Sequence, residues 1–393
     1  MNIELSNLVE DLSDSATLAV ADKARELRAQ GVDVVTFGAG EPDFDTPQHI
    51  KDAAVAALAA GDTKYVSPTS GKTELREAIC DYTRRYCQVE YHPDQICVTC
   101  GGKDALYMAL AAVINPGDEV IVPVPYWVSY PEQARMLGGK PVFVAGEVEH
   151  GGRLDPRRLA EAITPRTRVC IINSPSNPTG YTYTRAELAA IAEVLRPTNV
   201  IVFSDEIYHR LYFGQEPPTS FAALDGMHER TLTFSGASKS FAMTGWRIGY
   251  AAGAVNVIQA MTRVQSQTTS GPASFVQSAF IAALTGDQEC VEAMRRSFKA
   301  RGEKMHAALE ALPGVSCAKP TGAFYAFPDV SGTFSQLGVT NAADFAQVAL
   351  QRAHVAVVPG NAFGWDTHVR FSFATREAII DEGMRRMGEF LRG

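Results

Sequence analysis

The chain has 393 residues, which favours two or three compact regions over a single core. Its content of 46% hydrophobic and 20% charged residues is that of an ordinary soluble globular protein. The net charge of −8 argues against nonspecific binding to nucleic acid or to an anionic membrane, because both need a basic surface. We therefore expect no nucleic-acid partner and no membrane partner.

The first twenty residues lack a basic flank followed by an apolar stretch, so we expect no signal peptide. The seven cysteines are odd in number and show no framework spacing, which favours reduced thiols and a cytoplasmic location. Cys97 and Cys100 have CxxC spacing, but their segment alternates like a strand, and we interpret both as packing residues. The eight histidines are scattered, with no HxxxH or His/Cys cluster, so the sequence predicts no metal site.

Strand-like and helix-like segments alternate through the middle of the chain. Short β-branched runs occur in "QICVTCGG", "EVIVPVP", "RVCIINSP", "VIVFSDEIY" and "TLTFSGAS", and amphipathic stretches such as Lys103–Ile114 and Arg185–Leu195 separate several of them. This pattern predicts an α/β fold with a mostly parallel central sheet covered by helices on both faces.

The pattern changes after about Thr285. A long helical run, "DQECVEAMRRSFKARGEKMHAALEAL", precedes strand-like "GAFYAFPDV", helix-like "AADFAQVALQRA", strand-like "HVRFSFA" and a last helix. We expect a large domain over residues 45–284 and a smaller α+β domain over 285–393. Residues 1–44 are too few to fold alone, and we expect them to pack on the small domain.

Chemically useful residues follow each of the five predicted strands, and in a doubly wound sheet ligands bind beyond the carboxyl ends of the strands. They are Gly101, Gly102 and Lys103 after the first strand, Tyr126 and Trp127 after the second, Asn173 and Asn177 after the third, Asp205 and Tyr208 after the fourth, and Lys239 after the fifth. Each has an ordinary structural explanation when taken singly, such as a tight turn or core packing. Their joint occurrence at one sheet edge indicates a binding site.

Together these residue types match the parts of one cofactor. Two glycines before a helix suit a phosphate, although "GGK" is not a Walker A loop and "GAGEPD" is not a dinucleotide fingerprint. The Trp127 indole can stack on a flat ring, and the Asp205 carboxylate, set in an apolar strand, needs a partner such as a protonated ring nitrogen. Lys239 is a nucleophile for an aldehyde, and Arg247 in apolar "GWRIGY" needs an anion. This combination indicates pyridoxal 5′-phosphate.

From about Ser15 to its end, the chain resembles the class I aminotransferases of the fold-type-I pyridoxal-phosphate family, and within them the bacterial aspartate aminotransferase subgroup. The resemblance rests on "AGEPDFDTP", "TKYVSPTSG", "GGKDALY", "PYWVSYPE", "NSPSNPTG", "SDEIY", "SKSFAMTGWRIGY", "GAFYAF" and "VRFSFA". It implies the fold-type-I architecture, with a small domain built from both termini. It also implies a homodimer with shared active sites and transfer of an amino group from L-aspartate to 2-oxoglutarate.

The resemblance also assigns roles to residues of this chain. Lys239 would hold the cofactor covalently at its aldehyde and then move a proton at the substrate Cα, and Asp205 would pair with the pyridine nitrogen. The remaining cofactor contacts would be Tyr208 and Asn177 at the ring oxygen, Trp127 on the ring face, and Gly102, Lys103, Ser238, Arg247 and the partner subunit's Tyr65 at the phosphate. Arg370 would bind the substrate α-carboxylate beside Gly40, Asn177 and Trp127. Lys103, Ser15 and Thr17 would bind its side-chain carboxylate.

Two departures from the family pattern concern this site. Gly236 stands where many relatives have a serine, whose role Ser235 and Ser238 can share, and "VQSQTTSGPAS" lacks the partner-subunit arginine of the eukaryotic and enteric enzymes. The segment "DLSDSAT" is acidic where prephenate-accepting relatives have a basic residue, so we do not expect prephenate activity. The alternatives are transamination of alanine, methionine or aromatic amino acids, a cysteine-conjugate β-lyase, and a non-catalytic protein that binds pyridoxal phosphate.

Overall fold

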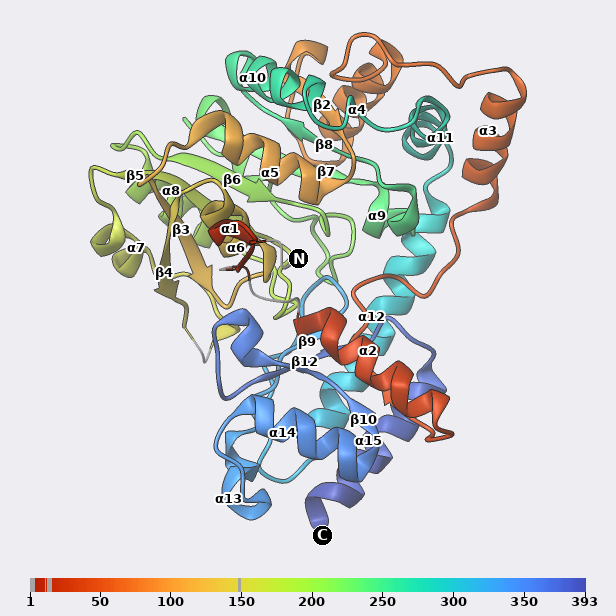
Figure 1. Cartoon of the computed structure of the whole chain (residues 1–393), viewed down its shortest axis with the longest axis vertical. Coiled ribbons are helices and arrows are strands. Elements are labelled where there is room, and N and C mark those ends of the chain that lie inside the picture. The colour runs from red at the N-terminus through yellow and green to blue at the C-terminus, as the bar shows by residue number, and fades with distance from the viewer. Residues whose placement is uncertain (1–3, 11, 13–15, 148–149) are drawn as a thin grey trace.

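The computed structural model describes residues 4–10, 12, 16–147 and 150–393. None of the described helices combines the length and the apolar character that a membrane-spanning segment requires. The chain forms a larger region around one wide sheet and a smaller region that contains the C-terminus (Figure 1).

The central sheet has seven strands in the order β2-β8-β7-β6-β5-β3-β4. All neighbouring pairs are parallel except those of β8, which runs antiparallel to both β7 and β2. Each of the five predicted strand segments coincides with one of these strands, although β5 begins one residue earlier than predicted, and β4 and β8 were not predicted. The strands are β2 (Ile96–Thr99), β3 (Glu119–Val124), β4 (Lys140–Ala145), β5 (Thr167–Asn173), β6 (Ile201–Asp205), β7 (Thr231–Gly236) and β8 (Gly249–Ala252).

The strand order reverses at β3. From β3 the chain goes to β4 at the sheet edge and returns to β5 on the other side of β3. In an open α/β sheet such a switch point leaves a crevice beyond the strand ends. The residues that follow β3 and β5, including Trp127 and Asn177, are therefore placed at this crevice.

Helices cover both faces of the sheet, which explains the apolar runs of its strands. Ile171 and Phe203 face a core shared with α5 (Gly102–Val113), α6 (Ser129–Met136) and α10 (Val255–Ser266). Their strand neighbours Cys170 and Val202 face the opposite core, with α7 (Pro156–Ala162) and α8 (Arg185–Leu195). A third core lies beside β2 and β8 and is built by α3 (Gln48–Ala59), α4 (Thr73–Tyr86) and α11 (Ser274–Thr285).

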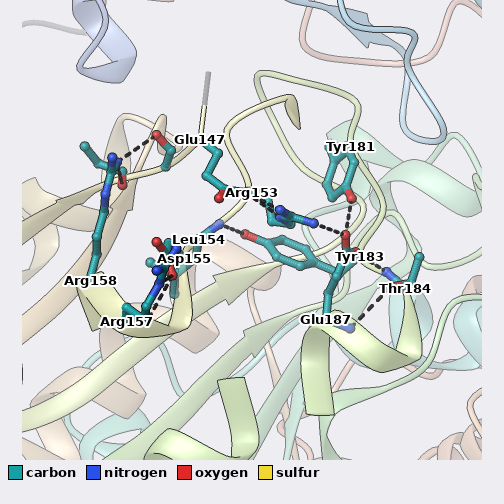
Figure 2. Close-up of polar contacts among 12 residues, drawn as sticks. Glu147, Arg153, Leu154, Asp155, Arg157, Arg158, Tyr181, Tyr183, Thr184 and Glu187 are labelled. Carbon is teal, nitrogen blue, oxygen red and sulfur yellow. Dashed lines mark hydrogen bonds and ion pairs between the residues drawn. The ribbon is translucent and has the colours of Figure 1, made fainter. Parts of the chain in front are cut away.

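A polar network fixes the connection between β4 and α8 (Figure 2). Arg153 lies between Glu147 and Glu187, with 2.9 Å from its Nη1 to Glu187 Oε1. Glu187 also accepts from the Thr184 backbone N–H, which completes a capping box at the start of α8. The Asp155 side chain caps α7 by accepting from the Arg157 N–H. The turn after β4 is thus tied to the helix that follows β5.

The long helix α12 (Glu289–Glu310) passes from the larger region into the smaller one (Figure 1). Its Val291 packs in the α3–α4–α11 core, whereas Met294 and Phe298 pack in the core of the smaller region. That second core is closed by α14 (Ala342–Val348) and α15 (Glu377–Arg392) and by a three-stranded antiparallel sheet of β11 (Val358–Pro359), β12 (Val369–Ser372) and β9 (Tyr325–Ala326).

The chain before residue 45 joins the smaller region through a short parallel pair. It carries α1 (Asn7–Glu10), α2 (Ala16–Ala29) and β1 (Val35–Thr36), and β1 pairs with β10 (Val355–Ala356). Val35 and Phe37 are buried in the same core as residues of α12, α14 and α15. We propose on these contacts that the chain divides into domains near residues 44 and 285, with α12 as the connecting helix.

Candidate active site

One cavity of about 700 Å³ lies where the carboxyl ends of the strands meet the smaller region. It brings together most of the predicted site residues, and α2 adds side chains that were not predicted. The predicted residues that line it are Gly40, Gly102, Lys103, Trp127, Asn177, Asp205, Tyr208, Ser238, Lys239, Arg247 and Arg370.

Three predicted residues are not placed in this cavity. Tyr65 is 93% exposed on the surface of the chain, so it does not contribute to the site of its own subunit. Ser15 and the side chain of Thr17 lie outside the described part of the chain, and the side chains of α2 described at the cavity are Ala21, Ala24 and Arg28.

Lys239 lies in the short helix α9 (Ala237–Ser240), which begins directly after β7. Its Nζ donates a hydrogen bond of 2.5 Å to the backbone oxygen of Gly40. Burial lowers the pKa of Lys239 to about 8, opposed by nearby Glu41 and reinforced by the charges of Arg370 and Arg247. A neutral, nucleophilic amine is therefore accessible close to neutral pH.

Asp205 ends β6 and is 6% exposed. The Tyr130 hydroxyl donates to its Oδ2 at 2.6 Å, and the Ile207 N–H donates to its Oδ1 at 3.2 Å. Burial raises the pKa of Asp205 to about 6, while these hydrogen bonds and Lys239 favour the ionised form. A cationic N–H placed against Oδ1 would stabilise this carboxylate.

Arg370, on β12, is a fully buried guanidinium without a carboxylate partner among the described ion pairs. Its Nη1 donates to Asn177 Oδ1 at 2.9 Å and its Nη2 donates to the Gly38 oxygen at 3.0 Å, while its Nε has no partner. The guanidinium lies 4.5 Å from the centre of the Tyr325 ring. A buried charge is costly without a counterion, so this rigid fork is suited to a carboxylate from a ligand.

The other end of the cavity has the features of a phosphate site. Gly101 has a φ of 93°, which favours glycine, and α5 starts at Gly102 with free backbone N–H groups. A Cβ at Gly101 would lie 2.8 Å from Arg247 Nη2, so glycine leaves room for this guanidinium in its present position. Arg247 Nη1 donates to the Thr244 oxygen at 2.9 Å, and Lys103 Nζ lies 5.0 Å from the centre of the Trp127 ring.

Cationic side chains outnumber carboxylates at this cavity, which Arg28, Glu41 and Asp205 also line. Lys103, Lys239, Arg247 and Arg370 all line it, and none of them belongs to an ion pair in the described part of the chain. Burial and Arg247 lower the pKa of Lys103. Two cations at the α5 end and a third on β12 indicate a ligand with separate anionic groups.

Close backbone packing explains the glycine at position 236. A Cβ at this position would lie 2.7 Å from Gly249 Cα and 2.9 Å from the Ile248 oxygen. Real Cβ atoms do not approach backbone so closely, so Gly236 lets β7 and β8 pair directly beside the phosphate end.

The sequence profile of the family described as "Aminotransferase class I and II" matches residues 32–387. This chain belongs to that family. The aminotransferase is 45% identical to the aspartate aminotransferase of Bacillus subtilis and 48% identical to the aspartate/prephenate aminotransferase of Cereibacter sphaeroides, with 99% of each chain covered. The predicted resemblance is thereby confirmed.

Solved structures confirm the fold of this aminotransferase. The aspartate aminotransferase of Rhizobium meliloti superposes with a TM-score of 0.95 at 39% identity, over 100% of this chain and 99% of the other. The Thermus thermophilus aspartate aminotransferase with maleate superposes with a TM-score of 0.93 at 44% identity, over 99% and 100%. The aminotransferase therefore has the predicted fold-type-I architecture.

Sequence reasoning missed several polar neighbours in the site of this aminotransferase. Tyr130 contacts Asp205, and the hydroxyls of Tyr208 and Tyr325 lie 3.0 Å apart. Asn173 was named as a strand-end residue, but its partners were not predicted: it accepts from the Asn177 N–H and donates to the backbone oxygen of Asp205, each at 2.9 Å. Tyr130 and Tyr325 lie within "PYWVSYPE" and "GAFYAF", but only tertiary packing shows which tyrosine meets which partner.

Proposed function

We propose that this aminotransferase uses pyridoxal 5′-phosphate to transfer an amino group from L-aspartate to 2-oxoglutarate. The observation that carries the proposal is the set of cations in one cavity that form no ion pair with a described residue, together with a buried acid, Asp205. A phosphate, a pyridinium nitrogen, an aldehyde and a substrate carboxylate would each meet a complementary group there.

The residues fit the cofactor at each of its functional groups. Backbone N–H groups of Gly102 and Lys103, the Ser238 side chain and Arg247 would hold the phosphate at the start of α5. Asp205, oriented by Tyr130, would accept from the ring N–H. Trp127 would cover the ring face, and Tyr208 and Asn177 would bond to the ring oxygen.

Substrate orientation would depend on two cationic residues. Arg370, held by Asn177 and Gly38, would bind the α-carboxylate through a bidentate pair, with Gly40 and Trp127 beside it. Lys103 would bind the side-chain carboxylate of a dicarboxylic amino acid, together with Ser15 and Thr17 of the N-terminal segment. The relatives named for aspartate and the neighbour solved with maleate support a dicarboxylate.

Lys239 would move the proton at the reacting carbon. When bound, the cofactor ring withdraws electrons from the bond that breaks at the substrate Cα. The pKa of about 8 leaves a substantial fraction of the Lys239 amine neutral, so it can accept the Cα proton and return it to another carbon. The carbonyl oxygen of Gly40, 2.5 Å from Nζ, orients this amine.

We also propose a homodimer in which Tyr65 contacts the phosphate of the partner subunit's site. Tyr65 follows α3, whose Val55 and Leu58 are 65% and 45% exposed. Apolar side chains exposed together on one segment are typical of an interface.

The proposal is tested by an absorbance titration of the purified protein supplied with pyridoxal phosphate. We expect a visible cofactor band that falls on addition of L-aspartate and returns on addition of 2-oxoglutarate. A band that ignores aspartate but responds to alanine or to an aromatic amino acid would leave the cofactor proposal intact and remove the dicarboxylate specificity. Pyruvate and ammonia in place of glutamate would indicate β-elimination.

Lys103→Ala tests the origin of dicarboxylate specificity. The backbone N–H of residue 103 survives this change, so the phosphate contact is preserved while the side-chain cation is lost. We expect kcat/KM for L-aspartate to fall at least about tenfold more than that for L-alanine, since about 1.5–3 kcal/mol attaches to a hydrogen bond with a charged group. Equal losses for both substrates would contradict the role of Lys103 in specificity.

A further inference from the structure

A second, smaller cavity lies next to the catalytic cavity, and three potential metal ligands line it. Cys87 follows the last residue of α4, and Glu206 and His209 follow β6. The Cys87 thiol, a Glu206 carboxylate oxygen and a His209 ring nitrogen all lie within 4.8 Å of one another. The two cavities share only Ser235 among their lining residues.

Two polar atoms at this cavity lack hydrogen-bond partners although they are buried. Glu206 is 3% exposed, and its Oε1 accepts from the hydroxyls of Ser204 and Ser220, each at 2.8 Å, whereas its Oε2 has no partner. His209 is 4% exposed, and its Nδ1 likewise has no partner. Unpartnered buried polar atoms of this kind call for a ligand.

The hydrogen bonding of His209 leaves a lone pair that faces Glu206. Its Nε2 lies 3.1 Å from the Tyr86 carbonyl oxygen, which can only accept, so Nε2 carries the proton of the neutral ring. The Nδ1 lone pair then lies 3.6 Å from Glu206 Oε2, too far for a hydrogen bond between the two groups. Two acceptors facing each other at this distance favour a cation between them.

Size and charge agree with a metal ion. The cavity is about 10 Å³, which is enough for one water-sized occupant. A divalent ion bound by a thiolate, a carboxylate and a neutral imidazole gives a site with no net charge, as burial requires. Arg210 also lines the cavity, but its charge is matched by Glu292, 2.9 Å from its Nη2, and its guanidinium lies 3.9 Å from the centre of the Tyr86 ring.

We propose that Cys87 Sγ, Glu206 Oε2 and His209 Nδ1 bind one zinc ion. Thiolate, imidazole and carboxylate together are a ligand set that Zn²⁺ prefers, and they leave one of its four coordination positions open. Binding forms a Zn–S bond, and the proton of the Cys87 thiol is released to solvent. The ion would join the end of α4 to the segment that directly follows Asp205 of the catalytic cavity, a structural role that needs no step in catalysis.

The site escaped sequence reasoning because its ligands share no spacing motif. The expectation of no metal site rested on the absence of a His/Cys cluster along the chain, whereas this set is assembled by packing α4 against the end of β6.

The test uses the full-length holoenzyme. After incubation with zinc sulfate and dialysis, we expect one zinc per chain by mass spectrometry and a higher melting temperature than for the zinc-free protein. With Co²⁺ in place of zinc, we expect the long-wavelength visible bands of tetrahedral cobalt, which lie apart from cofactor absorption. Cys87→Ser and His209→Gln are each expected to weaken zinc binding at least about tenfold.

Cys290→Ser is the matched control, since Cys290 and Cys87 are both half-buried against the same core. It is expected to keep the zinc affinity of the unchanged chain. Wild-type protein that retains no zinc and gives no tetrahedral cobalt bands would overturn the proposal and leave a single water as the occupant. Unchanged zinc binding in Cys87→Ser would overturn it too. The wild-type measurements decide the question even where a variant fails to fold.

Discussion

Burial moves the pKa values of Lys239 and Asp205 toward neutrality from opposite sides. The pKa of the Lys239 amine falls to about 8 and the pKa of the Asp205 carboxyl rises to about 6, because burial removes the water that stabilises the charged form of each group. The Asp205 carboxylate would be stabilised by a cationic ligand atom. The Lys239 amine would be stabilised by a covalent bond that removes its charge. Under the proposed function, cofactor binding therefore offsets part of the free-energy cost of burying these two groups.

The rate at which cofactor-free protein captures pyridoxal phosphate is expected to rise with pH, with a midpoint near 8. Below this pH the Lys239 amine is protonated and cannot attack an aldehyde, and above it the neutral form dominates. Stopped-flow absorbance over neutral to alkaline pH measures the rate, and Lys239→Ala, which has no amine, should show no borohydride-trapped adduct at any pH. A midpoint near 10.5 would show that the lysine is not perturbed.

Arg370→Lys is expected to lower kcat/KM for L-aspartate by about tenfold to a hundredfold, or about 1.5–3 kcal/mol. Lysine keeps the charge but loses the planar fork that Asn177 and Gly38 orient. Steady-state kinetics with both amino donor and oxo acid provide the measurement. Arg385→Lys, a change on the exposed face of α15, is the control and should leave the kinetics unaltered.

At the scale of elements, the chain runs from β7 through α9 into β8. Lys239 lies in α9, and Arg247 lies two residues before β8. Gly236 and Gly249 allow β8 to pair closely with β7. A Cβ at Gly249 would also lie 2.6 Å from the Gly102 N atom, at the start of α5. This contact brings the start of α5 close to α9 and β8, so these three elements would together form the proposed phosphate site.

Gly236→Ser is expected to reduce the free energy of unfolding by about 1–3 kcal/mol, because the new Cβ forces backbone of β8 to move. Urea unfolding followed by circular dichroism measures the change. Gly245→Ala is the control, as nothing lies within 4 Å of a Cβ at that position, and it should shift the unfolding free energy far less. Equal stability of Gly236→Ser and the unchanged protein would mean that β8 adapts without cost.

At the scale of the whole molecule, the cavity lies between two regions whose cores are separate. Asp205 and Lys239 belong to the larger region, on β6 and α9, whereas Arg370 lies on β12 of the smaller region and Gly40 lies in the segment before residue 45. α12 contributes to cores of both regions, and Tyr208 and Leu211, which follow β6, also pack in the core of the smaller region. The site is therefore complete only when the two regions are docked.

The protein is expected to be a dimer in solution, with about twice the chain mass of 42.4 kDa by light scattering. Val55→Glu combined with Leu58→Glu places charges on the exposed face of α3, and we expect this variant to be monomeric and to bind pyridoxal phosphate more weakly, because Tyr65 no longer reaches a partner. Val255→Glu, on α10 at another part of the surface, should remain dimeric (Figure 1). A dimeric double variant would exclude this face as the interface.

The sequence alone predicted the parallel sheet and most of the cavity. Apolar runs such as "VCII" and "VIVF" predict strands buried on both faces, and the polar residues directly after them mark the ligand edge. The strand β4 was missed because it lies at the sheet edge with a partly exposed pattern. The strand β8 was missed because it is short, with Tyr250 among glycine and alanine, and packing places it between two neighbours.

Tertiary structure decided what local patterns cannot encode. Strand order, the contact of Tyr130 with Asp205, the close return at Gly236 and the meeting of Cys87 with Glu206 and His209 all join residues far apart in the chain. A residue's type and its neighbours in sequence determine its local conformation and its chemistry. Its partner, its burial and hence its pKa depend on segments that fold against it from elsewhere, so they follow only from the packed structure.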